Sequence, residues 1–278
     1  MKLARLQRPA TPVGRVATAF LRAAMARAAS YPMAFVMTEF AALIPILVYF
    51  FVARLVEVSG PSVGGDYFTF AAIGIITTHA LNAGLQGFGH ELDVAIKQGR
   101  FEALLVEPVP WRALPLGLAE WPILVRTSGA AVSFAVAIAL GGDFRAIGFV
   151  TAVVLLLLGT LAALSIGIIA GSIKALSKES DPVLTLYQLA ASVLAGAFFP
   201  LELLPPVVRV LSYTIPHTYV LQAMRRVMMP AGESLPGLSA GEATLILVGF
   251  NLILLPAALW FFGRSLEVGR RLGLLGGY

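Results

Sequence analysis

Residues 147–173 read IGFVTAVVLLLLGTLAALSIGIIAGSI and contain no Lys, Arg, Asp or Glu. A helix needs about 20 mostly apolar residues to cross a bilayer, because each residue adds about 1.5 Å and the hydrocarbon core is about 30 Å thick. This stretch therefore predicts a transmembrane helix.

Five more apolar segments, each bounded by charged residues, Gly or Pro, lie on either side of this stretch. They occupy residues 33–56, 67–88, 118–140, 183–199 and 243–262. The composition agrees, because 58% of the 278 residues are hydrophobic and 13% are charged, whereas soluble domains carry about a quarter charged residues. The sequence predicts an all-α integral membrane protein with six transmembrane helices in a single domain.

We divide this domain into a cytoplasmic interfacial arm at residues 1–32, a six-helix bundle at 33–263 and a cytoplasmic tail at 264–278. With both termini in the cytoplasm, fourteen Lys and Arg residues lie on the cytoplasmic side and five outside, with Arg126 left within a span. Cytoplasmic loops carry an excess of basic residues. We therefore expect a multi-pass protein of the cell (inner) membrane with both termini cytoplasmic.

The N-terminal arm is basic, and Arg15, Arg22 and Arg27 interrupt its apolar residues. It lacks the uninterrupted apolar region of a signal peptide. Residues 12–30 predict a weakly amphipathic helix along the membrane surface, where arginines meet anionic headgroups; a disordered basic tail is the alternative. The net charge of +5 does not indicate a nucleic-acid partner, because the basic residues flank the apolar segments.

The loop at residues 90–115 combines charge with an apolar pattern. Phe101, Leu104 and Leu105 have the spacing of one helix face, and Pro108 ends the pattern. A short amphipathic cytoplasmic helix fits, either as a docking element for a soluble partner or as a helix resting on headgroups. The outer connection at residues 200–242 contains an apolar run too short to span, which predicts short extracytoplasmic re-entrant or interfacial helices.

Two runs of residues carry a family resemblance. The first contains Gly99, Glu102, Leu104, Leu105, Pro108, Val109, Arg112, Leu116 and Gly117. The second contains Gly196, Phe198, Phe199, Pro200, Leu201, Glu202, Leu204, Pro205, Ser212, Ile215, Pro216, Thr218, Tyr219 and Arg225. They resemble the cytoplasmic loop and the signature between the fifth and sixth spans of the ABC-2 family of exporter permeases. The resemblance covers nearly the whole chain.

The resemblance implies a transport subunit that pairs with separate ATPase subunits and with a second permease, as a homodimer or heterodimer. The sequence agrees, because it contains no Gly-x-x-x-x-Gly-Lys-Ser/Thr phosphate loop. No cofactor is expected on this chain, and ATP and Mg²⁺ belong to the partner ATPase. Lys97 and Glu107 depart from the acidic and small residues frequent in the family, so we expect a dedicated ATPase.

The resemblance also implies roles for both runs. The loop helix would dock in the ATPase and couple its motion to the spans through Lys97, Gly99, Arg100, Phe101, Glu102, Leu104, Leu105, Pro108 and Arg112. The outer segment would form an outer gate through Phe198, Phe199, Pro200, Glu202, Pro205, Pro216 and Tyr219. The titratable residues Glu202, Arg209, His217, Arg225 and Arg226 stand among apolar residues and fit either such a gate or an amphipathic cap on the bundle.

Polar residues follow one face of each of two spans. His79, Asn82, Gln86 and His90 recur at helical spacing in the second span. Thr185, Gln188, Ser192 and Gly196 repeat that spacing in the fifth. Polar groups facing lipid would be unsatisfied, so both stripes should face protein or water. They either line a translocation pathway or hold helices together by hydrogen bonds.

Charged residues within spans need partners, because a charge at the bilayer centre costs roughly 2.5–3.5 kcal/mol on insertion scales. We expect an ion pair of Arg126 with Glu39 or Glu120, with a structural role, and interhelical hydrogen bonds from Asn251. A metal site is not expected, since the chain has no Cys and only three His, and His90-Glu91 lacks the second His of an intramembrane metalloprotease.

The competing functional classes are an intramembrane enzyme and an ion-coupled carrier. A carrier would need more acidic residues near the midplane than Glu39 and Glu120. For an ABC-2 permease the expected cargo is an amphiphilic drug, antibiotic or lipid, with a polysaccharide or glycolipid precursor as the alternative.

Overall fold

The computed structural model describes residues 13–30, 32–59, 67–106, 109–177, 182–230, 232, 235 and 237–271. Within this part the chain is helical and contains no strand. The elements are α1 Val13–Ser30, α2 Pro32–Ser59, α3 Tyr67–Lys97, α4 Arg100–Val106, α5 Ala113–Ala139, η1 Ala146–Gly148, α6 Phe149–Ser177, α7 Pro182–Leu194, η2 Leu201–Leu203, α8 Pro206–Ser212, α9 Pro216–Met228 and α10 Ala240–Arg271.

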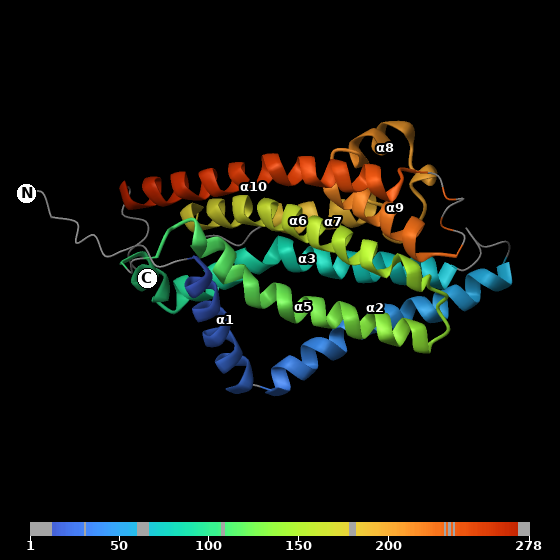
Figure 1. Cartoon of the computed structure of the whole chain (residues 1–278), viewed down its shortest axis with the longest axis horizontal. Helices are drawn as coiled ribbons and strands as arrows, with labels where there is room; N and C mark the ends of the chain where they lie inside the picture. The colour runs from blue at the N-terminus through green and yellow to red at the C-terminus, as the bar shows by residue number, and fades with distance from the viewer. Residues whose placement is uncertain are drawn as a thin grey trace, which may run out of the picture.

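Helix α3 occupies the centre of an elongated bundle in which α5, α6 and α10 run along the same long axis (Figure 1). It packs on α5 and α6, and most of its side chains are buried. Small residues permit the close approach to α6. A methyl group at Gly84 would lie 2.3 Å from the carbonyl oxygen of Thr160, and one at Gly167 would lie 2.2 Å from that of Leu85.

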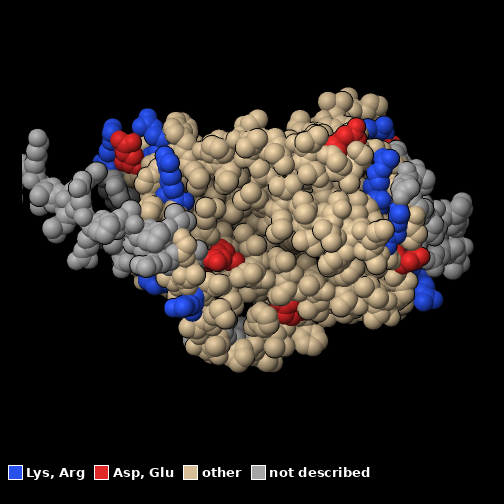
Figure 2. Space-filling model, viewed as in Figure 1, with Lys and Arg blue, Asp and Glu red and all other residues tan. Residues whose placement is uncertain are grey.

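In the part of the chain that the structure describes, five helices are long and apolar enough to cross a membrane. They are Phe35–Leu55, Tyr67–Lys97, Ala113–Ala139, Ala146–Lys174 and Ala240–Gly269. Figure 2 shows the matching surface, with basic side chains near the two ends of the molecule and a broad band of uncharged residues between them, interrupted by acidic side chains. The predictions of an all-α fold and a multi-pass membrane protein are confirmed.

The predicted fifth span at 183–199, and with it the count of six spans, is not confirmed, because α7 ends at Leu194. Its 13 residues extend about 20 Å, which is less than the hydrocarbon thickness. The helix ends before Gly196, whose φ is +71°, a left-handed conformation that glycine adopts without strain. The amide of Gly196 then bonds back to the carbonyl of Val193 (3.0 Å).

Two other helices continue nine residues past their predicted C-terminal ends. Helix α3 continues to Lys97, so His90 lies within the helix, and the loop begins at Gly99, whose φ is +67°. Helix α10 continues to Arg271, so the first part of the predicted tail at 264–278 is helical, while residues 272–278 lie outside the described part. Glu267 forms ion pairs with Arg264 and Arg271, and these pairs allow α10 to continue beyond the apolar segment.

Helix α1 confirms the helical prediction for the arm. It crosses the bundle axis near the end where α4 lies (Figure 1). Its apolar side packs on the start of α5, where a methyl group at Gly117 would lie 2.7 Å from the ring of Phe20. The Arg22 side chain is exposed. This placement suits a helix lying along a membrane surface.

Candidate functional site

Helix α4 is a short amphipathic element held on one end of the bundle. Phe101 is only 2% exposed and packs with Phe88, Leu114 and Phe262, which come from α3, α5 and α10. Leu104 and Leu105 pack against the same cluster. The predicted apolar face therefore lies against the bundle.

Charged residues surround this anchored face. Lys97 Nζ lies 2.7 Å from Asp93 Oδ2, and Lys174 of α6 lies 3.4 Å from Asp93 Oδ1. Arg100 is exposed and donates from Nε to Gln98 Oε1 (2.7 Å). The side chain of Glu102 and all of Glu107 and Pro108 lie outside the described residues. The end of the bundle thus offers basic groups to solvent beside a fixed hydrophobic anchor.

The link from α4 to α5 passes Trp111 and Arg112. The Trp111 ring lies against α10, because a methyl group at Gly263 would be 2.7 Å from it. The Arg112 guanidinium lies 5.1 Å from the Trp111 ring centroid. Arg112, predicted to face the ATPase, therefore lines a groove beside α10.

The two polar stripes meet at one point. Gln86 of α3 donates from Nε2 to Gln188 Oε1 of α7 (2.6 Å). Ser192 bonds the carbonyl of Gln188 in its own helix (2.9 Å), and Thr185 is exposed. Of the other α3 stripe residues, His79 and Asn82 are half-buried and His90 is exposed. Hydrogen bonding between the two helices is present, whereas lining of a pathway stays a prediction.

The predicted ion pair of Glu39 with Arg126 is wrong. Ser128 Oγ donates to Glu39 Oε1 (3.0 Å), and the other carboxylate oxygen has no hydrogen-bond partner among the described residues. Glu39 lies over Gly129, where a methyl group would be 3.1 Å from Oε2. Arg126 lies near enough to His79 of α3 to act on it electrostatically. Glu120 likewise makes no ion pair within the described ranges.

Arg225 of α9 anchors the end of α7. Its side chain is 4% exposed, and it donates from Nη1 to the carbonyl of Gly196 (2.8 Å) and from Nη2 to that of Ala197 (2.6 Å). The guanidinium carbon lies 3.5 Å from the ring centroid of Phe70 of α3. These carbonyls would otherwise be unsatisfied where the helix stops. Arg225 is therefore a structural clamp between α3, α7 and α9.

Two α3 residues complete the clamp and were not predicted from the sequence. Tyr67 donates its hydroxyl to the carbonyl of Phe198 (3.3 Å). A methyl group at Gly74 would lie only 1.9 Å from the carbonyl oxygen of Ala197, so only glycine permits this approach. An isolated glycine inside a helical pattern was the available signal.

The predicted outer-gate residues occupy one end of the bundle but do not all meet. Phe198 stacks on Tyr49 of α2, with ring centroids 5.0 Å apart. Tyr219 donates to the carbonyl of Tyr213 (2.7 Å). Arg209 Nη2 bonds the carbonyls of Glu202 (2.5 Å) and Leu204 (3.2 Å). Of the others, Phe199 and Pro200 are half-buried before η2, Pro205 is exposed before α8, and Pro216 is buried at the start of α9.

Burial lowers the pKa of two groups on α9. His217 is buried, with Nδ1 3.5 Å from the Tyr187 hydroxyl, and burial lowers the pKa of its imidazole to about 4. Burial also lowers the pKa of the Arg225 guanidinium, to about 9, against the opposing influence of Glu202 and Tyr67. At neutral pH, His217 is uncharged and Arg225 is charged.

The described residues contain no group of three or more His, Asp or Glu side chains placed to hold a metal ion. Asn251 of α10 donates to the carbonyl of Leu158 in α6 (3.0 Å), the interhelical bond predicted for it.

Comparison with known proteins assigns the family. The model of the ABC-2 type transporter family matches residues 14–229, which include α1 to α9 and the two runs of residues noted in the sequence. A search of curated proteins gave no match. The match covers well over half of the chain, and the helices long enough to cross a membrane agree with it. The chain belongs to the ABC-2 type transporter family and is a membrane-embedded permease subunit of an ABC transporter.

Proposed function

We propose that this permease is half of an ATP-driven exporter that moves an amphiphilic drug, antibiotic or lipid out of the cytoplasm or the inner leaflet. It works with a second permease, identical or related, and with a separate ATPase that binds ATP and Mg²⁺. The observation that carries this proposal is α4, whose apolar face is fixed by Phe101 while basic residues remain exposed beside it.

The anchoring of α4 suits a transmitting role. Phe101 lies in a buried cluster with residues of α3, α5 and α10, and α4 contacts α3, so a push on α4 can pass through this cluster to three spans. The ion pair of Asp93 with Lys174 joins α3 to α6 at the same end. A helix resting only on headgroups would need no such connections. Lys97, Gly99, Arg100 and Arg112, with Glu102 and Pro108, are therefore proposed to form the ATPase-docking region.

The proposed topology has both termini in the cytoplasm of a cell whose inner membrane holds the protein. Helix α7 is then the short fifth of six membrane segments, and η2 and α8 form an extracytoplasmic re-entrant pair before α9. The exposed basic residues at the α4 end support this orientation.

The proposed translocation pathway follows the polar stripes of α3 and α7. Gln86 and Gln188 mark where the helices meet, while His79 and Asn82 continue the α3 stripe toward the outer end. Arg126 near His79 adds a charge along this route. The proposed outer gate is the segment from Phe198 to Tyr219, held shut by the Arg225 clamp.

Reconstitution with its ATPase tests the proposal. We expect ATPase activity stimulated by amphiphilic drugs or lipids and not by glycan precursors. Arg100→Glu should lower coupled activity with little loss of stability, because the side chain is exposed. Arg54→Glu is the matched control, because Arg54 lies on α2 at the opposite end of the bundle, and this variant should keep activity. Stimulation by glycan precursors alone would contradict the proposed amphiphilic cargo. Full activity of Arg100→Glu would show that Arg100 is not part of the coupling surface.

A further inference from the structure

A groove of about 650 Å³ lies between α10 and the link from α4 to α5. Leu255, Pro256 and Leu259 form its apolar wall, and the indoles of Trp111 and Trp260 flank it. Arg112, Arg264 and Glu267 contribute its polar end. None of the roles proposed above for the pathway or gate uses this groove.

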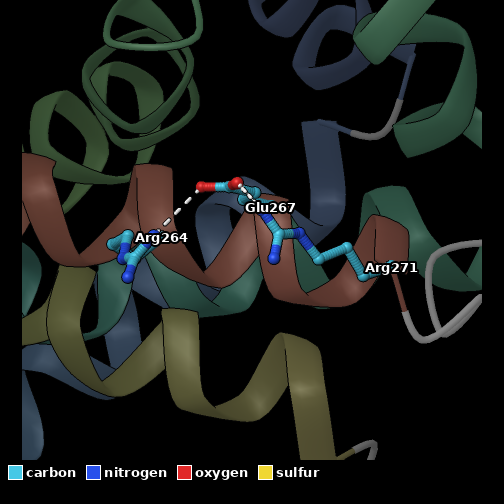
Figure 3. Close-up of polar contacts among 3 residues, drawn as sticks. All are labelled: Arg264, Glu267 and Arg271. Atoms are coloured by element: carbon cyan, nitrogen blue, oxygen red, sulfur yellow. Dashed lines mark hydrogen bonds and ion pairs between the residues drawn. The ribbon is translucent and has the colours of Figure 1, made fainter.

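The polar end of the groove is basic. Arg264 Nη1 lies 3.2 Å from Glu267 Oε2, and Arg271 pairs with the other oxygen of the same carboxylate (Figure 3). One carboxylate is thus shared by two arginines. Arg112 makes no ion pair within the described residues and only covers the Trp111 ring. Among the described side chains, Arg112, Arg264 and Arg271 against Glu267 give a net charge of +2 near the opening.

The apolar wall continues along the surface of α10. Leu252 and Ile253 are 71% and 72% exposed, and Trp260 is 65% exposed. All belong to a helix that is long and apolar enough to span the bilayer. Tryptophan and arginine together are typical of the level where lipid headgroups meet the hydrocarbon. The groove therefore offers a basic end at headgroup depth and an apolar surface leading into the hydrocarbon.

We propose that the groove binds an anionic phospholipid, with its phosphate between Arg112 and Arg264 and an acyl chain along Leu255, Leu259 and Trp260. A soluble phosphate would use the arginines and leave the apolar wall uncovered, which favours a lipid. Because Trp111 and Arg112 connect α4 to α5, the lipid would hold this link in place. The site does not depend on the cargo, and of its residues only Arg112 also belongs to the proposed ATPase-docking region.

The three tryptophans of the chain, Trp111, Trp121 and Trp260, allow a direct test. In a Trp121→Phe background, only the two groove indoles fluoresce. The protein is placed in phosphatidylcholine bilayers containing a minority of brominated phosphatidylglycerol or, in parallel, phosphatidylcholine with the same brominated chains. We expect phosphatidylglycerol to quench with about fivefold higher apparent affinity for each basic side chain it contacts, the size of one arginine at an anionic surface.

Charge variants test whether the preference for phosphatidylglycerol comes from the groove. Arg112→Gln and Arg264→Gln should each reduce it about fivefold, Glu267→Gln should increase it, and Arg54→Gln, at the other end of the bundle, should leave it unchanged. Arg264 is 62% exposed, so its replacement should not affect folding. Equal quenching by the two lipids, preference retained in the double arginine variant, or relief of quenching by soluble glycerol phosphate would each overturn the proposal. Reduced ATPase capture by Arg264→Gln with unchanged lipid preference would do so too.

Discussion

Arg225 shows how one buried cation can satisfy the end of an apolar helix. The carbonyls of Gly196 and Ala197 follow the last turn of α7 and would be unsatisfied without a donor. The guanidinium supplies both donors, and the ring of Phe70 lies against its charge at 3.5 Å. Its planar fork matches two adjacent acceptors, which a lysine ammonium cannot do equally well.

We therefore expect Arg225→Lys to lower the thermal stability of the detergent-solubilised protein. One of two buried carbonyls would lose its partner, and such a loss costs about 1–3 kcal/mol. The neighbouring Arg226→Lys is the control, since Arg226 is half-exposed and bonds only the carbonyl of Gly237 among the described residues. Equal melting temperatures for the two variants would contradict the clamp.

His217 should make stability depend on pH. Burial lowers the pKa of its imidazole from about 6.5 to about 4, so between these values the unfolded chain binds more protons than the folded protein. Stability due to this group is complete above pH 6.5 and falls as the pH decreases, by up to about 3 kcal/mol near pH 4. His217→Gln should unfold with a shallower pH dependence between pH 7 and 5. Parallel curves for the variant and the parent would count against a buried neutral imidazole.

At the scale of elements, the approach of α3 to the end of α7 depends on Gly74. We expect Gly74→Ala to destabilise the protein and to increase hydrogen exchange in residues 195–204, because the added methyl would meet the backbone oxygen of Ala197 at 1.9 Å. The contact is with backbone, so a side-chain rotation cannot relieve it.

Gly89→Ala in the same helix is the matched control. Its methyl group would make only ordinary contact, 4.0 Å from the Cα of Gly171. Alanine also favours a helix over glycine by up to about 1 kcal/mol. This variant should be neutral or stabilising. If both variants behave alike, the close approach at Gly74 does not hold the outer end together.

The elements most fully predicted from the sequence are those whose identity depends on local composition. Long uncharged runs such as 147–173 predict a transmembrane helix directly. The spacing of Phe101, Leu104 and Leu105 likewise predicted the buried face of α4. The end of α7 was not predicted, because an apolar run continues through Phe199 and only Gly196 interrupts it. The clamp escaped prediction because Arg225 and its partners Phe70 and Gly74 are about 150 residues apart.

The charged pairs were harder still to predict. Glu39 and Arg126 were expected to pair because each lies within a predicted span. On α5, however, Ser128 and Gly129 face Glu39, whereas Arg126 lies near His79 of α3. Gln86 and Gln188, by contrast, were predicted to lie on polar stripes that face protein or water, and the structure joins them by a hydrogen bond. Helical spacing fixes which residues share a face, but the partner of each face is set by packing.

At the scale of the whole molecule, the topology can be tested without removing native residues, because the chain contains no Cys. Single cysteines at Arg100 and at Val207, which is 83% exposed on α8, should react with a membrane-impermeant maleimide from opposite sides. Arg100→Cys should label only in inverted vesicles, and Val207→Cys only in right-side-out ones. Labelling of both positions from one side would rule out the proposed orientation.

The central claim is that α4 receives the motion of an ATPase, and a photo-crosslinking residue at position 100 tests it most directly in the native membrane. The account predicts a crosslinked product that contains a chain with the Gly-x-x-x-x-Gly-Lys-Ser/Thr phosphate loop, and no such product from position 54 at the opposite end. An intact complex that crosslinks to its ATPase equally from both positions, or not at all from position 100, would contradict it.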